Sequence, residues 1–303
     1  MLKIRSALLC ATMFGATAVS FPAMAQEAPA PTDAAEEEEA TGNDIIVTAS
    51  KRETTLQDTP IAVSVTTAET IEQAQVRDLI DIQTLVPSLR VAQSQSSQNT
   101  TFTIRGFGNG ANNAGIEPSV GVFIDGVYRS RSAAQIGDLP NLRRVEVLRG
   151  PQSTLFGKNA SAGIISVITA EPSFDFDAGG EISYGNYGAF VAKVDATGPL
   201  SDTVAFSIAG NYNRRDGYAQ DLRLGLDVNN RNRYGFRGQL LFDAHDAVKI
   251  RLIADYDNID ENCCIAANVV AGPTTAIINA LTGGRGLEPA VPFSYQVRNN
   301  FLS

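Results

Sequence analysis

The second half of the chain alternates apolar and polar residues with a period of two, and this pattern restricts the fold more than any other feature. The alternation is clearest in four segments: 190–196, 204–212, 236–242 and 248–256. In the last segment, Lys249, Arg251 and Asp255 share one face, while the other face is apolar. Alternating segments of about ten residues are typical of transmembrane β-strands, which meet lipid on one side only. A soluble β-sandwich is the alternative interpretation, since its strands also have one apolar face.

The connections between these segments favour the membrane interpretation. A tight turn at 185–188 joins the first two expected strands, and short turns at 198–202 and 243–247 join later pairs. The polar stretch 217–230 and the region from 258 onward are longer. If the first strand starts in the periplasm, the turns 198–202 and 243–247 lie there and the long loops lie outside, as in outer-membrane barrels. Tyrosines near strand ends suit the membrane interfaces: Tyr184, Tyr187, Tyr212, Tyr234 and Tyr256.

The composition argues against nucleic-acid binding and against enzyme chemistry. The 303 residues include 24 Lys and Arg against 33 Asp and Glu, a net charge of −9, whereas nucleic-acid binding needs a basic face. His245 is the single histidine, so neither a multi-histidine metal site nor a well-supported catalytic triad is expected. The sequence also lacks GxSxG, HExxH, Walker A and EF-hand spacings. We therefore expect no enzyme activity, no cofactor, no metal site and no nucleic-acid partner.

The first 25 residues predict a secretory signal peptide. Lys3 and Arg5 precede a mostly apolar stretch at 7–19, and the small-residue sequence AMA at 23–25 suits a cleavage site. An uncleaved membrane anchor is the alternative, but the apolar stretch is short for a spanning helix. Residues 26–44 are acidic and contain no basic residue, so we expect them to form a flexible tether.

A short β-prone run follows this acidic segment: Ile45, Ile46, Val47, Thr48 and Ala49. One interpretation is that it forms the first strand of a domain. The other is that it is offered to a partner protein as an added strand, where backbone hydrogen bonds give affinity and alternate side chains give specificity.

Residues 56–172 predict a compact region with both helix and strand. A capping box from Thr66 to Glu69 starts a helical stretch that ends at Pro87. Its apolar residues have near-helical spacing: Ile71, Ala74, Leu79, Ile82 and Leu85. Strand-like runs follow at 101–105, 120–124, 145–148 and 164–168. Gly, Asn and Ser separate these runs, which indicates a small, loop-rich domain.

Six motifs in this part of the chain resemble those of one family. They are DIIVTA at 44–49, PIAVSV at 60–65, IRGF at 104–107, VFIDGVY at 122–128, VEVLRGPQSTLFG at 145–157 and GIISVIT at 163–169. Each is weak alone, but this order, behind a signal peptide and before amphipathic strands, is highly specific. The whole chain resembles the N-terminal part of a TonB-dependent outer-membrane receptor, with 44–49 similar to the TonB box.

The resemblance implies an α+β plug domain followed by the first strands of an antiparallel transmembrane β-barrel, which is incomplete here. The expected organisation is a signal peptide at 1–25, a tether at 26–44 and a TonB box at 45–49. The plug then spans 56–172, and about five barrel strands with their loops span 178–303.

The resemblance also implies energised uptake of a scarce nutrient across the Gram-negative outer membrane. A small-molecule ligand, most simply a ferric siderophore-type chelate, would bind the plug apex and the extracellular loops. TonB, driven by the energising inner-membrane complex, would bind Ile45 to Ala49 as an added strand and open the plug. Outer-membrane lipid would surround the barrel. Cobalamin, saccharides and aromatic compounds are alternative cargoes.

Two further sets of residues receive roles from the resemblance. Arg105 and Arg149 match family arginines that pair with barrel glutamates inside the lumen, so they are expected to latch the plug to the barrel. An ordinary surface arginine is the alternative for each, and the expected partners would lie in later strands. The glycine-rich loop after Arg105 is expected to face the ligand through Phe107, Asn109, Asn112 and Asn113.

Cys263 and Cys264 are the only cysteines outside the signal peptide. In an oxidising compartment they form a vicinal disulfide, bond to cysteines beyond residue 303, or stay free. They are too few for a metal site of their own. The acidic residues Asp255, Asp257, Asp260 and Glu261 are interpreted as solvated loop charge. Attraction of Ca²⁺ is the alternative, but the stretch lacks the EF-hand glycine.

The length departs from the family pattern, because barrels of this type have about 22 strands. About five strands cannot close, and an open edge in lipid leaves backbone groups unpaired at several kcal/mol each. The expectation is a fragment of a longer protein or a truncated gene product. The alternative is a secreted or periplasmic plug-like binding protein, or a remnant without transport activity.

Overall fold

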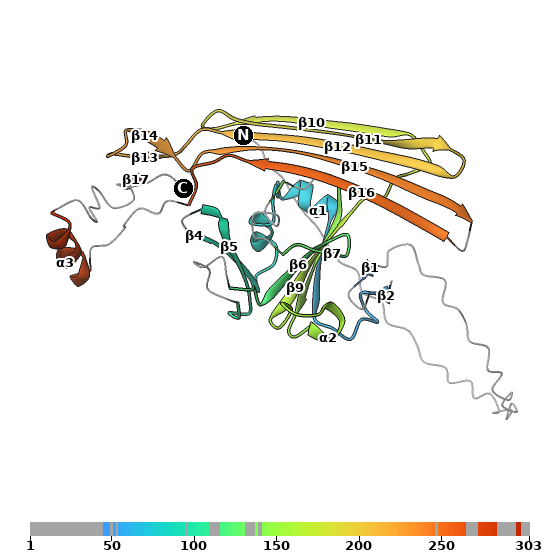
Figure 1. Cartoon of the computed structure of the whole chain (residues 1–303), viewed down its shortest axis with the longest axis horizontal. Helices are drawn as coiled ribbons and strands as arrows, with labels where there is room; N and C mark the ends of the chain where they lie inside the picture. The colour runs from blue at the N-terminus through green and yellow to red at the C-terminus, as the bar shows by residue number, and fades with distance from the viewer. Residues whose placement is uncertain are drawn as a thin grey trace, which may run out of the picture. The chain divides into compact units, whose positions relative to one another are not determined.

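The computed structural model describes residues 45–48, 51–52, 54–94, 96–108, 116–130, 137–138, 141–245, 248–264, 272–283 and 295–297. The predicted signal peptide, the tether and Ala49 lie outside these residues. The described residues form two main sheets (Figure 1). No helix among them is long and apolar enough to cross a membrane.

The first sheet, called here the plug sheet, has five strands in the order β3-β8-β9-β6-β7. Their bounds are β3 Val63–Thr67, β8 Leu142–Arg149, β9 Gly163–Thr169, β6 Val120–Ile124 and β7 Val127–Tyr128. β6 and β9 are parallel, and the other neighbours are antiparallel. Every residue of β6 is buried, as a strand with both faces covered requires. The strands predicted at 120–124, 145–148 and 164–168 are confirmed.

Three short helices accompany this sheet: α1 Ala68–Gln73, the 3-10 helix η1 Asp81–Thr84 and α2 Ser153–Phe156. The long helical stretch predicted up to Pro87 is wrong in extent, because Gln75 has a left-handed backbone (φ +52°) that ends the first helix. The cap is also one residue later than predicted. Thr67, not Thr66, accepts the amide of Thr70. The apolar side chains expected on that stretch, Leu79 and Ile82, are nevertheless buried.

Two small sheets complete this region. β4 Leu89–Ser94 pairs with β5 Ser96–Ile104, which confirms the strand predicted at 101–105 up to Ile104. β1 Ile46–Val47 pairs with β2 Thr54–Thr55. Buried apolar side chains fill both faces of the plug sheet in two clusters, and the smaller one contains Val47.

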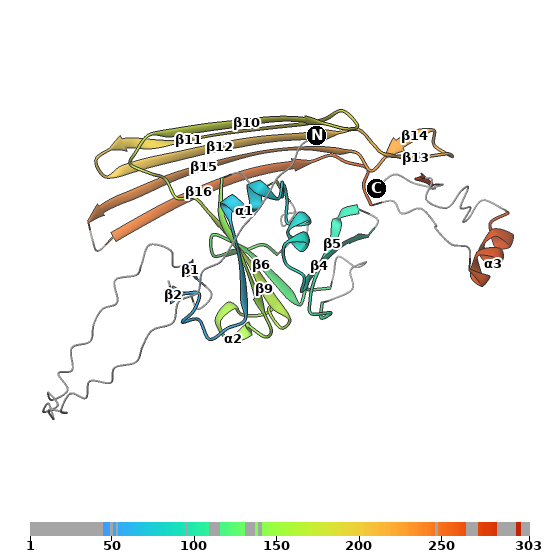
Figure 2. The ribbon, with the colours of Figure 1, turned by 180° about the vertical axis from the view of Figure 1, so that it is seen from behind.

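The second sheet, called the wall, has five antiparallel strands in chain order (Figures 1 and 2). They are β10 Asp177–Gly185, β11 Ala189–Ser201, β12 Val204–Arg215, β15 Arg231–His245 and β16 Val248–Ile259. The alternation predicted from the sequence is confirmed: Ile208 and Phe236 are 56% and 62% exposed, while Asn213 and Arg233 are buried. The turn predicted at 198–202 is shorter than expected, because β11 continues to Ser201.

Two stretches predicted only as loops contain regular structure. Residues 217–230 include the hairpin β13 Ala219–Asp221 and β14 Leu226–Val228, and β17 Gln296–Val297 pairs in parallel with β13. The region after β16 includes α3 Pro273–Leu281. These elements are too short for a periodic signal, and the small sheet is held by contacts among its own strands.

Candidate functional site

The predicted partner-binding segment is folded against the plug sheet. Its strand β1 is only two residues long, and Val47 within it is fully buried. Val47 packs in a cluster with Phe123, Leu148, Ala160 and Ile164. The segment therefore forms part of the apolar cover on one face of the plug sheet.

A buried carboxylate holds the next residue of this segment. Glu146 on β8 is fully buried, and the backbone amide of Thr48 donates to its Oε1 (3.0 Å) and Oε2 (3.2 Å). The Thr48 hydroxyl donates to the same oxygens (3.2 and 3.3 Å). Arg144, two residues earlier on the same face of β8, donates its Nε–H to Glu146 Oε1 at 2.7 Å. A buried carboxylate needs such partners, and here they come from an arginine and from the segment itself.

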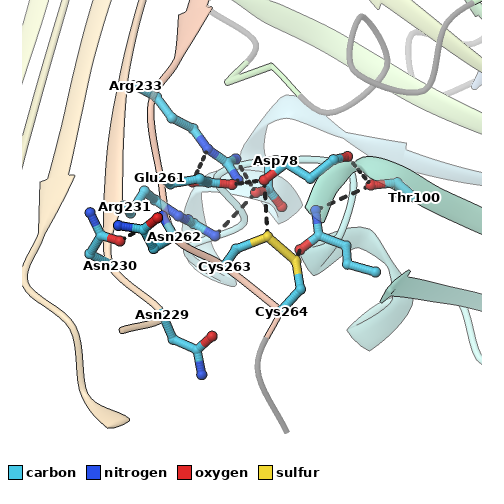
Figure 3. The surroundings of a disulfide bond; sticks show 12 residues. Asp78, Thr100, Asn229, Asn230, Arg231, Arg233, Glu261, Asn262, Cys263 and Cys264 are labelled. Atoms are coloured by element: carbon cyan, nitrogen blue, oxygen red, sulfur yellow. Dashed lines mark hydrogen bonds and ion pairs between the residues drawn. A yellow bond between two sulfur atoms is a disulfide. The ribbon is translucent and has the colours of Figure 1, made fainter. Parts of the chain in front are cut away.

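A second cluster joins the plug to the wall around Arg233 of β15. The guanidinium donates through Nε and NH2 to both oxygens of Glu261 (2.9 and 2.8 Å). Its NH1 donates to Asp78 (2.8 Å) and approaches Asp138 (3.4 Å), both in the plug. Arg231 also lies 3.3 Å from Asp78. Figure 3 shows Arg231 and Arg233 directed at Asp78, with Glu261 beside them.

Local structure positions the plug carboxylates of this cluster. Asp78 accepts the backbone amides of Ile80 and Asp81 (2.9 and 3.2 Å), so a tight turn fixes its carboxylate before η1. Asp138 accepts a hydrogen bond from Asn213 of β12 (2.6 Å). The arrangement gives one shared guanidinium three carboxylate neighbours, and its fork geometry suits that role.

The vicinal disulfide Cys263–Cys264 lies beside this cluster (Figure 3). Of the three alternatives left by the sequence, the structure has this one. Ser97 of β5 donates to Glu261 and lies 3.1 Å from the Cys263 sulfur, so the segment after β16 touches the plug at this point.

A third cluster surrounds Asp125 in the tight turn between β6 and β7. The turn has two left-handed residues, Asp125 (φ +47°) and Gly126 (φ +78°), as two-residue hairpins require. The carboxylate of Asp125 accepts the amide and hydroxyl of Thr169, each at 2.9 Å. It also binds Arg237 of β15 and lies 3.6 Å from Arg251 of β16.

Further ion pairs extend along the same two wall strands. Arg129 of the plug pairs with Asp255 of β16 (2.8 Å). Glu171, in the connection between plug and wall, pairs with Lys249 (2.7 Å) and lies 3.7 Å from Arg251. The acidic residues between 255 and 261 are thus not simply solvated loop charge. Asp255 is in β16, and both Asp255 and Glu261 are paired with arginines.

Burial and pairing shift the pKa values of these carboxyl groups in opposite directions. Burial raises the pKa of Asp138, and the opposing effects of Arg233 and Asn213 do not cancel it. Burial also acts to raise the pKa of Glu261, but the hydrogen bonds and charge of Arg233 outweigh it and lower the pKa. The hydrogen bond from Lys249 lowers the pKa of Glu171.

The predicted latch arginines lie elsewhere. Arg105 is exposed in a left-handed turn (φ +52°), and Arg149 is half-buried with its NH2 3.3 Å from the Val63 carbonyl. Neither pairs with a carboxylate among the described residues, so their latch role stays a prediction. Of the predicted ligand-facing residues, Phe107 is 73% exposed, while Asn109, Asn112 and Asn113 lie outside the described residues.

Sequence reasoning missed the plug–wall contacts that the structure contains. The polar face of the later strands signalled Arg237 and Arg251, but not what they would contact. The plug acids that meet arginines of the wall are Asp125, which pairs with Arg237, and Asp78 and Asp138, which pair with Arg233. They look like ordinary loop acids and lie far away in the chain. At Asp78, Asp125 and Asp138 the acid is on the plug and the arginine is on the wall, the reverse of the expected plug arginines and barrel glutamates. The pair Arg129–Asp255 has the opposite polarity, with its arginine on the plug.

The contacts are concentrated on one side of the plug. No ion pair between described residues joins the plug to β10 or β11. Instead, two adjacent cavities of about 240 and 320 Å³ lie between α1 and these strands. Their common lining includes Ile71, Glu72, Val76, Glu181 and Lys193.

A sheet domain joined by buried ion pairs to long antiparallel strands with one apolar and one charged face is the arrangement expected of a plug and the barrel strands around it. The family model "TonB-dependent Receptor Plug Domain" matches residues 55–164. The vitamin B12 transporter BtuB of Vibrio vulnificus is 26% identical over 211 residues, covering 68% of this chain and 32% of that protein. The ferrioxamine B receptor of Salmonella typhimurium is 28% identical over 233 residues, covering 72% and 31%.

Solved structures agree in fold. The ferric yersiniabactin uptake receptor FyuA of Yersinia pestis has a TM-score of 0.58 at 24% identity, covering 65% of this chain and 31% of that one. The pyoverdine receptor FpvA of Pseudomonas aeruginosa has a TM-score of 0.58 at 20% identity, covering 70% and 30%. The family model and these relatives support a TonB-dependent outer-membrane receptor of the Gram-negative outer membrane. The chain spans about a third of the length of these relatives.

Proposed function

We propose that this chain is the gate-bearing part of a receptor that imports a scarce small molecule with energy delivered through TonB. The plug domain and the amphipathic wall strands support this role. So do the relatives, which are named as transporters and receptors. We propose transport and no enzyme activity for this chain.

A ferric siderophore-type chelate is the proposed cargo. The supporting observation is that relatives and structural neighbours are named for ferrioxamine B, yersiniabactin and pyoverdine. Cobalamin is the second candidate, because the BtuB relative is named for vitamin B12. Ligand contact is proposed for the exposed Phe107 and its loop, at the plug apex.

The proposed organisation keeps the boundaries expected from the sequence. Residues 1–25 would direct export, 26–44 would give slack and 45–49 would bind TonB. Residues 56–172 would close the lumen, and 178–303 would contribute the first strands of the barrel. Arg149 is proposed to pair with a residue outside the described part of the chain, because its Nε is buried without a hydrogen-bond partner among the described residues.

The single observation that carries the proposal is the strand at 46–47, which lies within the segment 44–49 that resembles a TonB box and comes before the matched plug residues 55–164. Ile46→Pro removes a backbone donor from any strand pairing at this position. We expect it to abolish uptake of a panel of ferric chelates by cells that depend on this receptor, while chelate binding to the cells persists.

The matched control is Ile46→Val, which keeps the backbone donor and a β-branched side chain. It should import at close to the parent rate. Normal uptake by the Ile46→Pro cells would show that this segment is not where TonB acts.

A further inference from the structure

The backbone groups that a partner strand would use in segment 45–48 are already engaged inside the plug. The amide of Leu56 donates to the Ile45 carbonyl (2.8 Å), and the amide of Lys51 donates to the Thr48 carbonyl (2.9 Å). The amide of Thr48 donates to Glu146. An added strand obtains its affinity from such groups, so these bonds compete with partner binding.

The burial of Val47 also opposes binding of a partner to segment 45–48. Val47 is fully buried among Phe123, Leu148, Ala160 and Ile164, so a partner cannot contact it until the segment leaves the plug. Leaving also uncovers the apolar side chains of the plug sheet, which opposes release.

The strand pairing of the segment is too small to hold it alone. β1 and β2 pair over two residues each, and isolated two-stranded pairs are at best marginally stable. The fixed polar anchor beside them is Glu146, whose carboxylate accepts both donors of Thr48. Arg144 holds that carboxylate in place from the same strand, at 2.7 Å.

We propose that Glu146 is a positioning residue that holds segment 45–48 on the plug and so limits access of the partner strand. It acts as an autoinhibitory contact: the buried carboxylate loses two charge-assisted donors when the segment departs, so the docked state is favoured. The identity of the partner as TonB rests on the proposed function, whereas the docking itself does not.

Docking is tested by the reactivity of a buried thiol. In full-length receptor carrying Val47→Cys, the new thiol is shielded while the segment is docked, and Cys263 and Cys264 are unreactive as a disulfide. The parent without Val47→Cys gives the background rate. Adding Glu146→Gln removes the charge, and we expect maleimide labelling about tenfold faster, the size of a lost charge-assisted hydrogen bond.

A second variant avoids the plug core. Thr48→Val removes the hydroxyl donor but no plug side chain, so it cannot unfold the plug sheet. We expect a smaller acceleration in the same direction. The matched control is Glu72→Gln, an exposed carboxylate on α1 without contact to the segment, and it should label at the parent rate. If Thr48→Val, and a folded Glu146→Gln, both label at the parent rate, the proposal is wrong.

A binding arm separates this proposal from the proposed function. The purified C-terminal periplasmic domain of TonB is titrated onto receptors with native Val47 and without added chelate. Tighter binding to the Glu146→Gln variant than to the parent supports the autoinhibitory role, and equal measurable binding overturns it. If the domain binds neither receptor while labelling still accelerates, docking by Glu146 stands and the TonB assignment fails.

Discussion

The two sides of the plug are held very differently. Toward β15 and β16, plug carboxylates meet wall arginines in buried pairs, as at Asp78–Arg233 and Asp125–Arg237. Toward β10 and β11, the described residues form no plug–wall ion pair, and cavities separate α1 from the strands. Breaking a buried pair is costly, whereas parting two surfaces already separated by a cavity is not. We therefore expect the plug to shift first on the β10–β11 side.

The largest effect is expected from removing the shared guanidinium. Arg233→Gln leaves Asp78, Asp138 and Glu261 without their common partner, and loss of one member of a buried ion pair costs about 3–5 kcal/mol. Hydrogen exchange at residues 78–84 should become faster, because the turn that holds Asp78 is no longer fixed to the wall.

The control for this variant is Arg214→Gln on β12, where the arginine is largely exposed and its ion-pair partner among the described residues is Asp216, at 3.5 Å. It should leave exchange at 78–84 unchanged. Equal protection in the parent and in Arg233→Gln would mean that the β15–β16 side does not hold the plug.

Asp138→Asn is expected to have a smaller effect than Arg233→Gln, and not to weaken the contact between plug and wall. The pKa of Asp138 is raised while the plug is packed against the wall. Its contribution to this packing, called docking of the plug below, is therefore present at low pH and is lost as the pH rises through the raised pKa. Asp138→Asn mimics the protonated group, and docking at pH 7 should be unchanged or stronger. Exchange at 78–84 measures this between pH 4 and 7, with Asp78→Asn, which should weaken docking, as comparison.

Glu261 contributes the reverse pH dependence. Its pKa is lowered, so its contribution is present at neutral pH and is lost as the pH falls through the lowered pKa. If Asp138→Asn weakened docking at pH 7 as much as Asp78→Asn, Asp138 would instead act as a required charge.

The smallest effect is expected on the opposite side of the plug. Lys193 of β11 lines the cavities, and among the described residues it forms an ion pair with Glu181 of the wall itself, at 3.6 Å. Lys193→Gln should change the free energy of unfolding of the plug by less than about 0.5 kcal/mol, as for an exposed ion pair. A loss comparable to that of Arg233→Gln would remove the difference between the two sides.

The repeating parts of the fold could be predicted from the sequence. The wall strands show their alternation locally, and β6 reads as a continuous apolar run, so each signal lies within one element. The helix after Thr67 could not be bounded, because the spacing of Leu79 and Ile82 satisfies a helix although the backbone turns left-handed at Gln75. Leu79 and Ile82 are apolar because both are buried in the plug, not because they share one face of a helix.

The candidate site was only partly accessible to sequence reasoning. Segment 45–48 has local β propensity and could be singled out as a strand, but its docking on Glu146 depends on a residue about a hundred positions later. Glu146 itself reads as an ordinary polar position within a strand. The plug–wall pairs fail for the same reason, since Asp125 and Arg237 acquire their relation only when two separate sheets meet.

Asp125 satisfies two unrelated requirements at once. Its backbone must accept a positive φ to make the β6–β7 turn, and its carboxylate must reach Thr169 and Arg237. Asparagine meets the first requirement without the charge, glutamate keeps the charge but is a poor left-handed residue, and glycine makes the turn with no side chain. Very few substitutions are therefore expected to be neutral at this position. The amino-acid sequence of the β6–β7 turn is constrained at the point where the plug contacts the wall.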